Sequence, residues 1–253
     1  MIDCTGKPDN VHFWDTATGT ATCSFESSSF VVFSPTDTDV AVIRLGSIHW
    51  HMLKRDSLKG KTWGGQFSHD STPDAVCAFD SNGKTIIMSW DKKYLREYDP
   101  TTSNWSILRN SEQIDYRITS VACCPIKPGL FVVGDERGGL DIVISNADGC
   151  NFLSLCRLNT VNSVWVSACA WSQDGKWIAT GDDDGDIFLW NADVVVPTSV
   201  SFAFAMTLPR SNQSERTTNS GRTTGTVLVF SPDSTELIFT SGGLSFCVGY
   251  WAC

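Results

Sequence analysis

A segment of similar pattern recurs five times along this chain of 253 residues. Each copy has a short apolar strand, a turn, a second apolar strand, a polar turn and a third strand. The copies are Phe30–His51, Ala75–Asp99, Ser120–Asn146, Ser167–Asn191 and Val227–Trp251. The anchor residue before the first turn recurs after 46, 45, 47 and 59 residues. A nearly constant step of this size indicates stacked structural units rather than one catalytic core, and it predicts a binding scaffold.

The fourth copy shows the local signals most clearly. Its first strand ends at the anchor Trp171, and the turn Ser172–Gly175 places glycine where a positive φ is needed. Trp177–Thr180 is apolar at nearly every position, as expected for a strand between two neighbouring sheets. The polar turn Asp182–Gly185 then leads into a third strand over Ile187–Trp190. The anchors of the five copies are Phe33, Phe79, Cys124, Trp171 and Phe230.

Several short motifs in these copies resemble those of the WD40 repeat. The matching segments are Phe33–Pro35, Phe230–Asp233, Ser89–Lys92, Phe13–Asp15, Leu189–Asn191 and Tyr250–Trp251. The resemblance covers essentially the whole chain and implies an all-β fold, a β-propeller of four-stranded antiparallel blades around a central channel. It also implies that Trp14, Trp190 and Trp251 close their blades as structural residues.

The family often ties a blade together with a histidine, an aspartate and the closing tryptophan. Here only His69 with Asp91 fits that pattern, and Tyr98 replaces the tryptophan. We therefore expect His69 and Asp91 to be structural residues, and most blades to depend on apolar packing more than on a polar tie.

The ends of the repeat array are incomplete. We expect one propeller domain over 1–253, with about six blades of which the first and last are partial. The partial blades span 1–25 and 226–253; the complete blades span about 30–72, 75–110, 119–158 and 167–208; an inserted loop spans 209–225. We interpret the chain as a piece of a longer propeller, and the alternative is a six-bladed ring with two incomplete blades.

Composition narrows the class of partner. The formal net charge is −9, which argues against a general nucleic-acid binder because phosphate binding needs clustered Lys and Arg. No apolar run is long enough to span a membrane, and the ten cysteines lie mostly within strand-like segments. We expect reduced core thiols, no membrane contact and a cytoplasmic location, with a nuclear location as the alternative.

Two clusters raise the question of chemistry. His49 and His51 point to one face of a strand and could bind a metal ion, but we expect ordinary polar positions of a degenerate repeat. The carboxylates of Asp182–Asp186 could bind Ca²⁺, but we interpret them as a structural turn with Asp182 and Asp183 exposed. No nucleophile elbow, phosphate loop or zinc motif is present, and we expect no metal, no cofactor and no enzymatic activity.

Candidate binding residues come from the second polar turn of each blade, around the mouth of the channel. They are Arg44, Trp90, Arg137 and Asp183. An exposed tryptophan at a turn is typical of an interaction hot spot, although Trp90 could instead pack on Lys92 or on a neighbouring blade.

The loop 209–225 is rich in Ser, Thr and Asn and carries Arg210, Arg216 and Arg222 in an otherwise acidic chain. It either docks acidic partners or is phosphorylated beside its arginines, or it is an insertion without a role.

The pattern as a whole predicts a protein-interaction scaffold that presents peptide- or protein-binding surfaces within a larger signalling or multiprotein assembly. Other proteins or peptides are the expected partners. One alternative is a hydrolase- or lactonase-like propeller enzyme with a metal site in the central channel. The other is a degenerate structural fragment that binds nothing specific.

Overall fold

Short antiparallel strands make up the fold. The computed structural model describes residues 2–3, 10–15, 17–26, 28–35, 39–44, 48–54, 66–67, 76–82, 86–89, 95–99, 104–107, 116–146, 149–157, 164–183, 185–193, 201–208, 227–241 and 247–252. Every regular element among them is a β-strand, which confirms the predicted all-β class. The same residues include no helix long and apolar enough to cross a membrane.

The described strands form six antiparallel sheets, each an up-and-down meander in which strands adjacent in sequence pair. The first sheet contains β1 (Ile2–Asp3), β2 (Asn10–Asp15) and β3 (Thr20–Glu26). The second contains β4 (Ser28–Phe33), β5 (Asp39–Arg44), β6 (Ile48–Lys54) and β7 (Gln66–Phe67). The third contains β8 (Val76–Phe79), β9 (Ile86–Ser89), β10 (Arg96–Asp99) and β11 (Asn104–Ile107).

The second half of the chain repeats this organisation. The fourth sheet contains β12 (Ile118–Cys123), β13 (Leu130–Asp135), β14 (Gly139–Asn146) and β15 (Gly149–Arg157). The fifth contains β16 (Val166–Trp171), β17 (Trp177–Asp182), β18 (Ile187–Asp193) and β19 (Ser201–Leu208). The sixth contains β20 (Val227–Phe230), β21 (Glu236–Ser241) and β22 (Cys247–Ala252).

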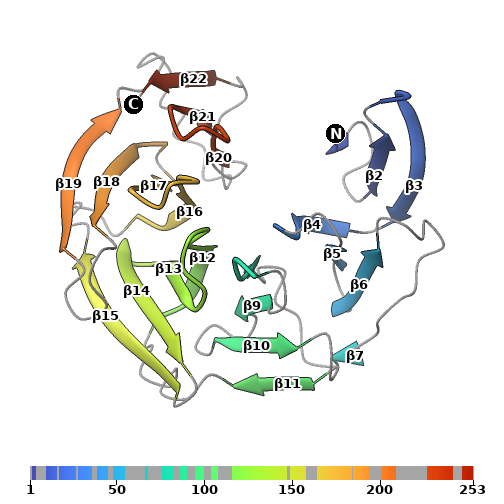
Figure 1. Cartoon of the computed structure of the whole chain (residues 1–253), viewed down its shortest axis with the longest axis horizontal. Coiled ribbons are helices and arrows are strands. Elements are labelled where there is room, and N and C mark those ends of the chain that lie inside the picture. Colours follow the sequence, from blue (N-terminus) through green and yellow to red (C-terminus); the bar gives the residue numbers. More distant parts are fainter. Residues whose placement is uncertain are drawn as a thin grey trace.

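The sheets stand around a common centre as the blades of a β-propeller (Figure 1). The strands β12, β16 and β20 lie toward the centre, whereas β11, β15 and β19 lie on the periphery. Contacts between sheets run in sequence from β2 to β4, β4 to β8, β8 to β12, β12 to β16 and β16 to β20. In Figure 1 the first and last sheets stand on either side of an opening in the ring.

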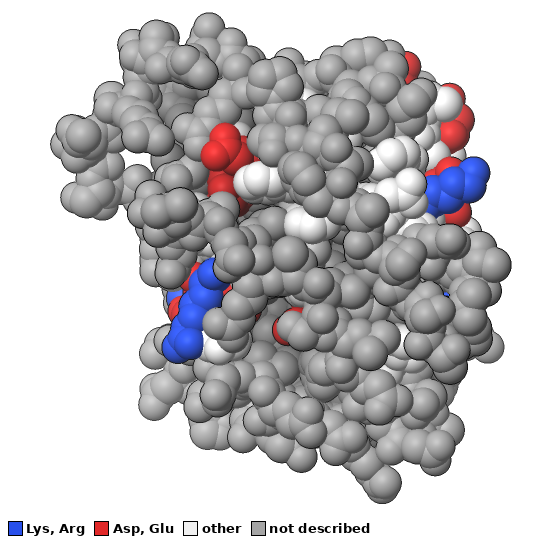
Figure 2. Space-filling view, turned by 90° about the vertical axis from the view of Figure 1, so that its left-hand side faces the viewer, with Lys and Arg blue, Asp and Glu red and all other residues white. Residues whose placement is uncertain are grey.

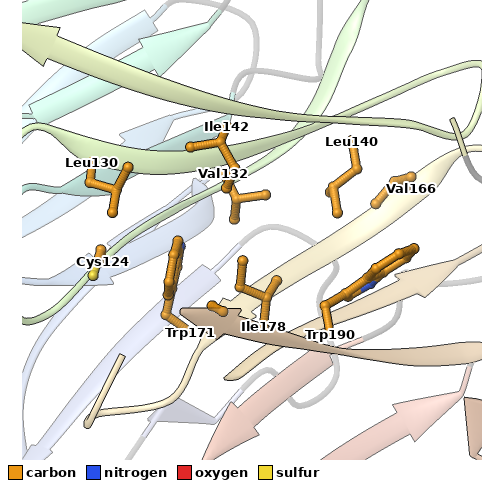
Figure 3. Close-up of a cluster of buried hydrophobic side chains, with 10 residues drawn as sticks. Cys124, Leu130, Val132, Leu140, Ile142, Val166, Trp171, Ile178 and Trp190 are labelled. Atoms are coloured by element: carbon orange, nitrogen blue, oxygen red, sulfur yellow. The ribbon is translucent and has the colours of Figure 1, made fainter. Parts of the chain in front are cut away.

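The largest described core cluster fills the space between the fourth and fifth sheets. Leu130, Val132, Leu140 and Ile142 face Trp171, Ile178 and Trp190 across this interface (Figure 3). The anchor Trp171 is 6% exposed, and its indole Nε1 donates a hydrogen bond of 3.1 Å to the carbonyl of Ala122 in the neighbouring sheet. The fourth and fifth sheets thus bury their apolar side chains against each other, as expected for stacked repeats.

The described side chains of the sixth sheet, all in β20 and β21, are buried on one face only. Leu228, Phe230, Leu237 and Phe239 pack against the fifth sheet, mainly on Ala179, Ile187 and Leu189. The alternate positions are apolar as well, but Val227, Val229 and Ile238 are 54%, 54% and 46% exposed. Because neighbouring residues of a strand point to opposite faces, one face of this sheet is core and the other is open.

Four of the five predicted anchors are buried. Phe79, Cys124, Trp171 and Phe230 are each at most 6% exposed, whereas Phe33 at the end of β4 is 52% exposed.

The turns after the anchors are built by side chains. Ser172 donates to Asp174 at 2.6 Å and accepts from the backbone N–H of Trp177 at 2.9 Å, while Asp174 accepts from the N–H of Lys176 at 3.0 Å. Burial on its own raises the pKa of the Asp174 carboxyl, but the hydrogen bonds from Ser172 and Lys176 outweigh it and leave the pKa below its usual value of 3.8. Gly175 has a φ of 72°, so the sequence prediction of a positive φ at this glycine is confirmed.

The corresponding turn of the sixth sheet contains Ser234 where the fifth sheet has Gly175, and Ser234 has a φ of 63°. A non-glycine residue is uncommon in this conformation. The hydroxyl of Ser234 accepts a hydrogen bond of 2.9 Å from the backbone N–H of Asp174, so this residue also links two neighbouring sheets.

Candidate functional site

The polar turns lie at the opposite strand ends from the anchors. In the fifth sheet Trp165 precedes β16 and Ser172 follows it, so the turn Asp182–Asp186 and the turn Ser172–Lys176 lie at opposite ends of the blade. Figure 2 views the outer wall of the ring on the side where Figure 1 shows β15 and β19, and most of the charged side chains that the structure describes there lie toward its two opposite edges. The predicted binding residues Arg137 and Asp183 belong to the polar-turn end.

A buried aspartate shapes each of the two described polar turns at this end. Asp135 accepts from the backbone N–H groups of Arg137 and Gly139, both at 2.7 Å, through the same oxygen. Asp182 accepts from the N–H of Asp186 at 2.8 Å in the same i to i+4 arrangement. The expectation that Asp182 is exposed is therefore wrong, since it is 2% exposed. Its carboxylate is buried because it replaces backbone partners that the turn lacks.

Replacement of Asp135 by Ala should lower the free energy of unfolding by about 1–3 kcal/mol, because two backbone N–H groups, that of buried Gly139 among them, would lose their acceptor. Replacement by Asn keeps an acceptor oxygen and should cost less. Urea denaturation of the wild type and both variants measures this difference. An equal loss in both variants would mean that the charge of Asp135, rather than its acceptor oxygen, stabilises the turn.

The polar turns also pair with the segments that precede the first strands. The N–H of Glu136 donates to the carbonyl of Arg117 at 3.0 Å, and the N–H of Asp183 donates to the carbonyl of Trp165 at 3.0 Å. Asp183 therefore corresponds to Glu136 in the neighbouring sheet, and the predicted pair Arg137 and Asp183 is one position out of register. The two lie in corresponding turns but not at corresponding positions.

Two arginine–aromatic pairs lie at this rim. The guanidinium of Arg137 lies 4.0 Å from the ring centroid of Tyr116, and that of Arg117 lies 5.0 Å from that of Trp165. Arg117 reaches from the fourth sheet to an aromatic residue of the fifth, so the pair crosses the boundary between two blades. Such contacts are attractive by about 0.5–2 kcal/mol, more when they are desolvated.

The residues of these contacts form a cluster at the rim that we call the rim site. Its members are Tyr116, Arg117, Glu136, Arg137, Trp165 and Asp183. Arg117 is buried, Arg137 is exposed, and the other four are half-buried. Tyr116, Arg117 and Trp165 were not among the predicted site residues, because they lie in links outside the repeated strand pattern. Their signal in the sequence is an aromatic residue or arginine directly before a first strand.

The rim site rests on a close junction between its two sheets. The hydroxyls of Thr119 and Ser120 lie 2.7 and 3.0 Å from the carbonyl oxygen of Val166, to which both donate. A Cβ atom added to Gly134 would lie 2.5 Å from the Ser120 hydroxyl and from a methyl group of Val166. The absence of a side chain at Gly134 thus permits the approach that fixes the spacing of the two turns.

Most of the other predicted site residues have no described side chain. Arg44 is the last residue of β5 and its side chain is outside the described set, as is all of Trp90. Arg210, Arg216 and Arg222 also lie outside the described residues, as do His69 and Asp91. Trp14 lies in β2 and Trp251 in β22, where only the backbone is described.

Trp190 is the one predicted closing tryptophan with a described side chain. It is 4% exposed, and its indole Nε1 donates to the hydroxyl of Thr180 at 3.0 Å. The fifth blade thus has a polar tie between its second and third strands, within the apolar cluster that contains Trp190.

Nucleophilic and metal chemistry find little support in the described residues. No three of their His, Cys, Asp or Glu side chains are grouped closely enough to hold a metal ion. The thiols of Cys77, Cys123, Cys124 and Cys169 are free, and burial raises the pKa of each, that of Cys169 to about 12. At neutral pH they remain protonated and act as apolar core groups.

Comparisons with known proteins agree with this fold. The family model "WD domain, G-beta repeat" matches residues 155–191, which include the anchor Trp171 and the tie residue Trp190. A chain in a solved structure titled "Crystal Structure of Mitotic Checkpoint Complex" is similar with a TM-score of 0.67 and 14% sequence identity. The match covers 96% of this chain and 68% of that chain. No curated protein sequence matches significantly.

Proposed function

We propose, from the premise that this chain belongs to the WD40-repeat family, that it is a protein-interaction scaffold and that the rim site is one of its contact surfaces. Propellers of this family generally act as such scaffolds. The resemblance inferred from the sequence motifs is confirmed, and the alternatives of a propeller enzyme and of a non-binding fragment gain no specific support.

The residue types of the rim site make it the best candidate for a contact surface. Arginine, tyrosine and tryptophan are the residues that most often dominate the energy of protein interfaces. The rim site presents the exposed Arg137 with the half-buried Tyr116 and Trp165, and the buried Arg117 holds Trp165 from below the surface. The hydrogen bonds from Thr119 and Ser120 to Val166 hold the two supporting sheets together. A surface held in this way loses little conformational entropy when a partner binds.

The charge of the chain and the structurally similar protein both indicate the class of partner. Glu136 is adjacent to Arg137 in the sequence, Asp183 lies in the corresponding turn of the next sheet, and the whole chain has a net charge of −9, so a phosphate backbone is a poor match. The similar chain of known structure belongs to a multiprotein complex according to its title, which supports protein partners for this chain too. We therefore propose a protein or peptide partner within a larger assembly.

Selection from a library of random peptides displayed against the immobilised full chain tests this proposal. We expect binders whose Kd rises more than about tenfold when Trp165 is replaced by Ala, because a central aromatic residue is a typical hot spot. Lys176→Ala is the matched control, since Lys176 lies at the opposite end of the same sheet and pairs with Asp174 at 3.4 Å. Failure to enrich any peptide, or equal binding by the Trp165 variant, would refute the proposed surface.

A further inference from the structure

We propose that Arg137 of the rim site is the receptor for a single carboxylate side chain of the protein partner. This inference rests on the proposed scaffold function and names the chemistry by which that surface selects what it binds.

The side chain of Arg137 is already oriented in the free protein. It is exposed, yet its guanidinium is stacked 4.0 Å above Tyr116 and its backbone N–H is held by Asp135 at 2.7 Å. A stacked guanidinium keeps the N–H groups at its edge available for donation. Much of the conformational entropy that a long side chain loses on binding is therefore already lost in the free protein.

The second observation is a contrast between the two arginines. Arg117 is 9% exposed, and its carbonyl and N–H both contact Glu136. Its position between two sheets indicates a structural role. Arg137 lies at the outer edge of the same surface, and within the described part of the chain no carboxylate forms an ion pair with it. Of the two cations, Arg137 is the one presented to solvent.

The third observation decides which anion fits. Glu136 precedes Arg137 in the sequence, the carboxylate of Asp135 lies under the same turn, and Asp183 lies in the adjacent turn. A phosphate group carries nearly two negative charges at neutral pH and would be repelled by these acids. One carboxylate carries a single charge and matches the two parallel N–H groups of a guanidinium. A partner segment with one acidic residue therefore fits better than an acidic run or a phosphorylated one.

Peptide selection with the full chain, followed by a double-mutant cycle, tests this inference. Peptides selected by the wild type should share an Asp or Glu at one position, and its replacement by Asn or Gln should raise the Kd by about 10–100-fold. In Arg137→Gln the same peptide change should have little further effect. Lys176→Gln removes one positive charge at the opposite strand end and should leave the Kd unchanged.

A further variant and a phosphorylated peptide distinguish the possible results. Arg137→Lys keeps the charge but loses the planar stack, so its affinity should lie between wild type and Arg137→Gln. A phosphoserine at the acidic position should bind more weakly than Glu; tighter binding would overturn the carboxylate assignment. Selected peptides that bind Arg137→Gln as well as wild type would overturn this inference and leave the scaffold function intact. Enrichment of no peptide would overturn both.

Discussion

Replacement of Trp171 by Ala should lower the free energy of unfolding by about 3–5 kcal/mol. The side chain is 6% exposed and lies among Leu130, Val132 and Ile178 in the interface between the fourth and fifth sheets (Figure 3). Its removal would leave a large cavity and also free the carbonyl of Ala122, which now accepts the indole N–H at 3.1 Å. Urea denaturation followed by circular dichroism measures the loss.

Replacement of Trp171 by Phe separates the two contributions. It keeps most of the apolar volume and removes the hydrogen bond, so we expect a smaller loss of stability than in the Ala variant. If both variants lose the same amount, the bond to Ala122 rather than the packing is the main contribution of this residue. If neither variant loses more than about 1 kcal/mol, the interface between these two blades is not a principal source of stability.

The periodicity of the sequence predicts most of the fold because strands and turns leave local signals. Short apolar runs mark the strands, and Ser172–Gly175 marks a turn whose positive φ is found at Gly175. The same reasoning finds the corresponding turn at Ser231–Asp233, where Ser231 donates to Asp233 at 2.6 Å. It does not predict that Ser234 adopts a φ of 63°, because that conformation is accompanied by a bond to the neighbouring sheet.

The rim site is harder to predict, for reasons that lie in tertiary structure. Asp182 and Asp183 are adjacent and chemically identical, yet one is buried beneath the turn and the other is half-buried at the surface. Hydropathy treats both as solvated, whereas the backbone N–H of Asp186 makes a buried acceptor favourable at Asp182. The stacking of Arg117 on Trp165 joins residues of different blades, and no local pattern indicates such a pair.

The number of blades stays a prediction. The described residues form six sheets, of which the first and last have three strands, and Figure 1 shows the ring open between those two sheets. Single substitutions in the sixth sheet can measure how much burial on each of its two faces contributes to the free energy of unfolding.

Leu237 and Ile238 are neighbours in β21 and give a direct measure of that consequence. Leu237 is fully buried against the fifth sheet, and its replacement by Ala should lower the free energy of unfolding by about 2–5 kcal/mol. Ile238 points to the opposite face and is 46% exposed, so its replacement by Ala should cost less than about 1 kcal/mol. The two variants remove side chains of similar size from the same strand.

The comparison of these two variants therefore measures the contribution of burial on each face, because the size of the removed side chain and its position in the chain are nearly matched. Thermal or urea denaturation at several protein concentrations is the measurement. A loss for Ile238→Ala as large as that for Leu237→Ala would show that the second face is covered in solution. A loss that grows with protein concentration would identify another copy of the chain as the cover, since association stabilises a folded state by mass action. A small loss that does not depend on concentration would show that the sixth sheet is stable with one face exposed to water.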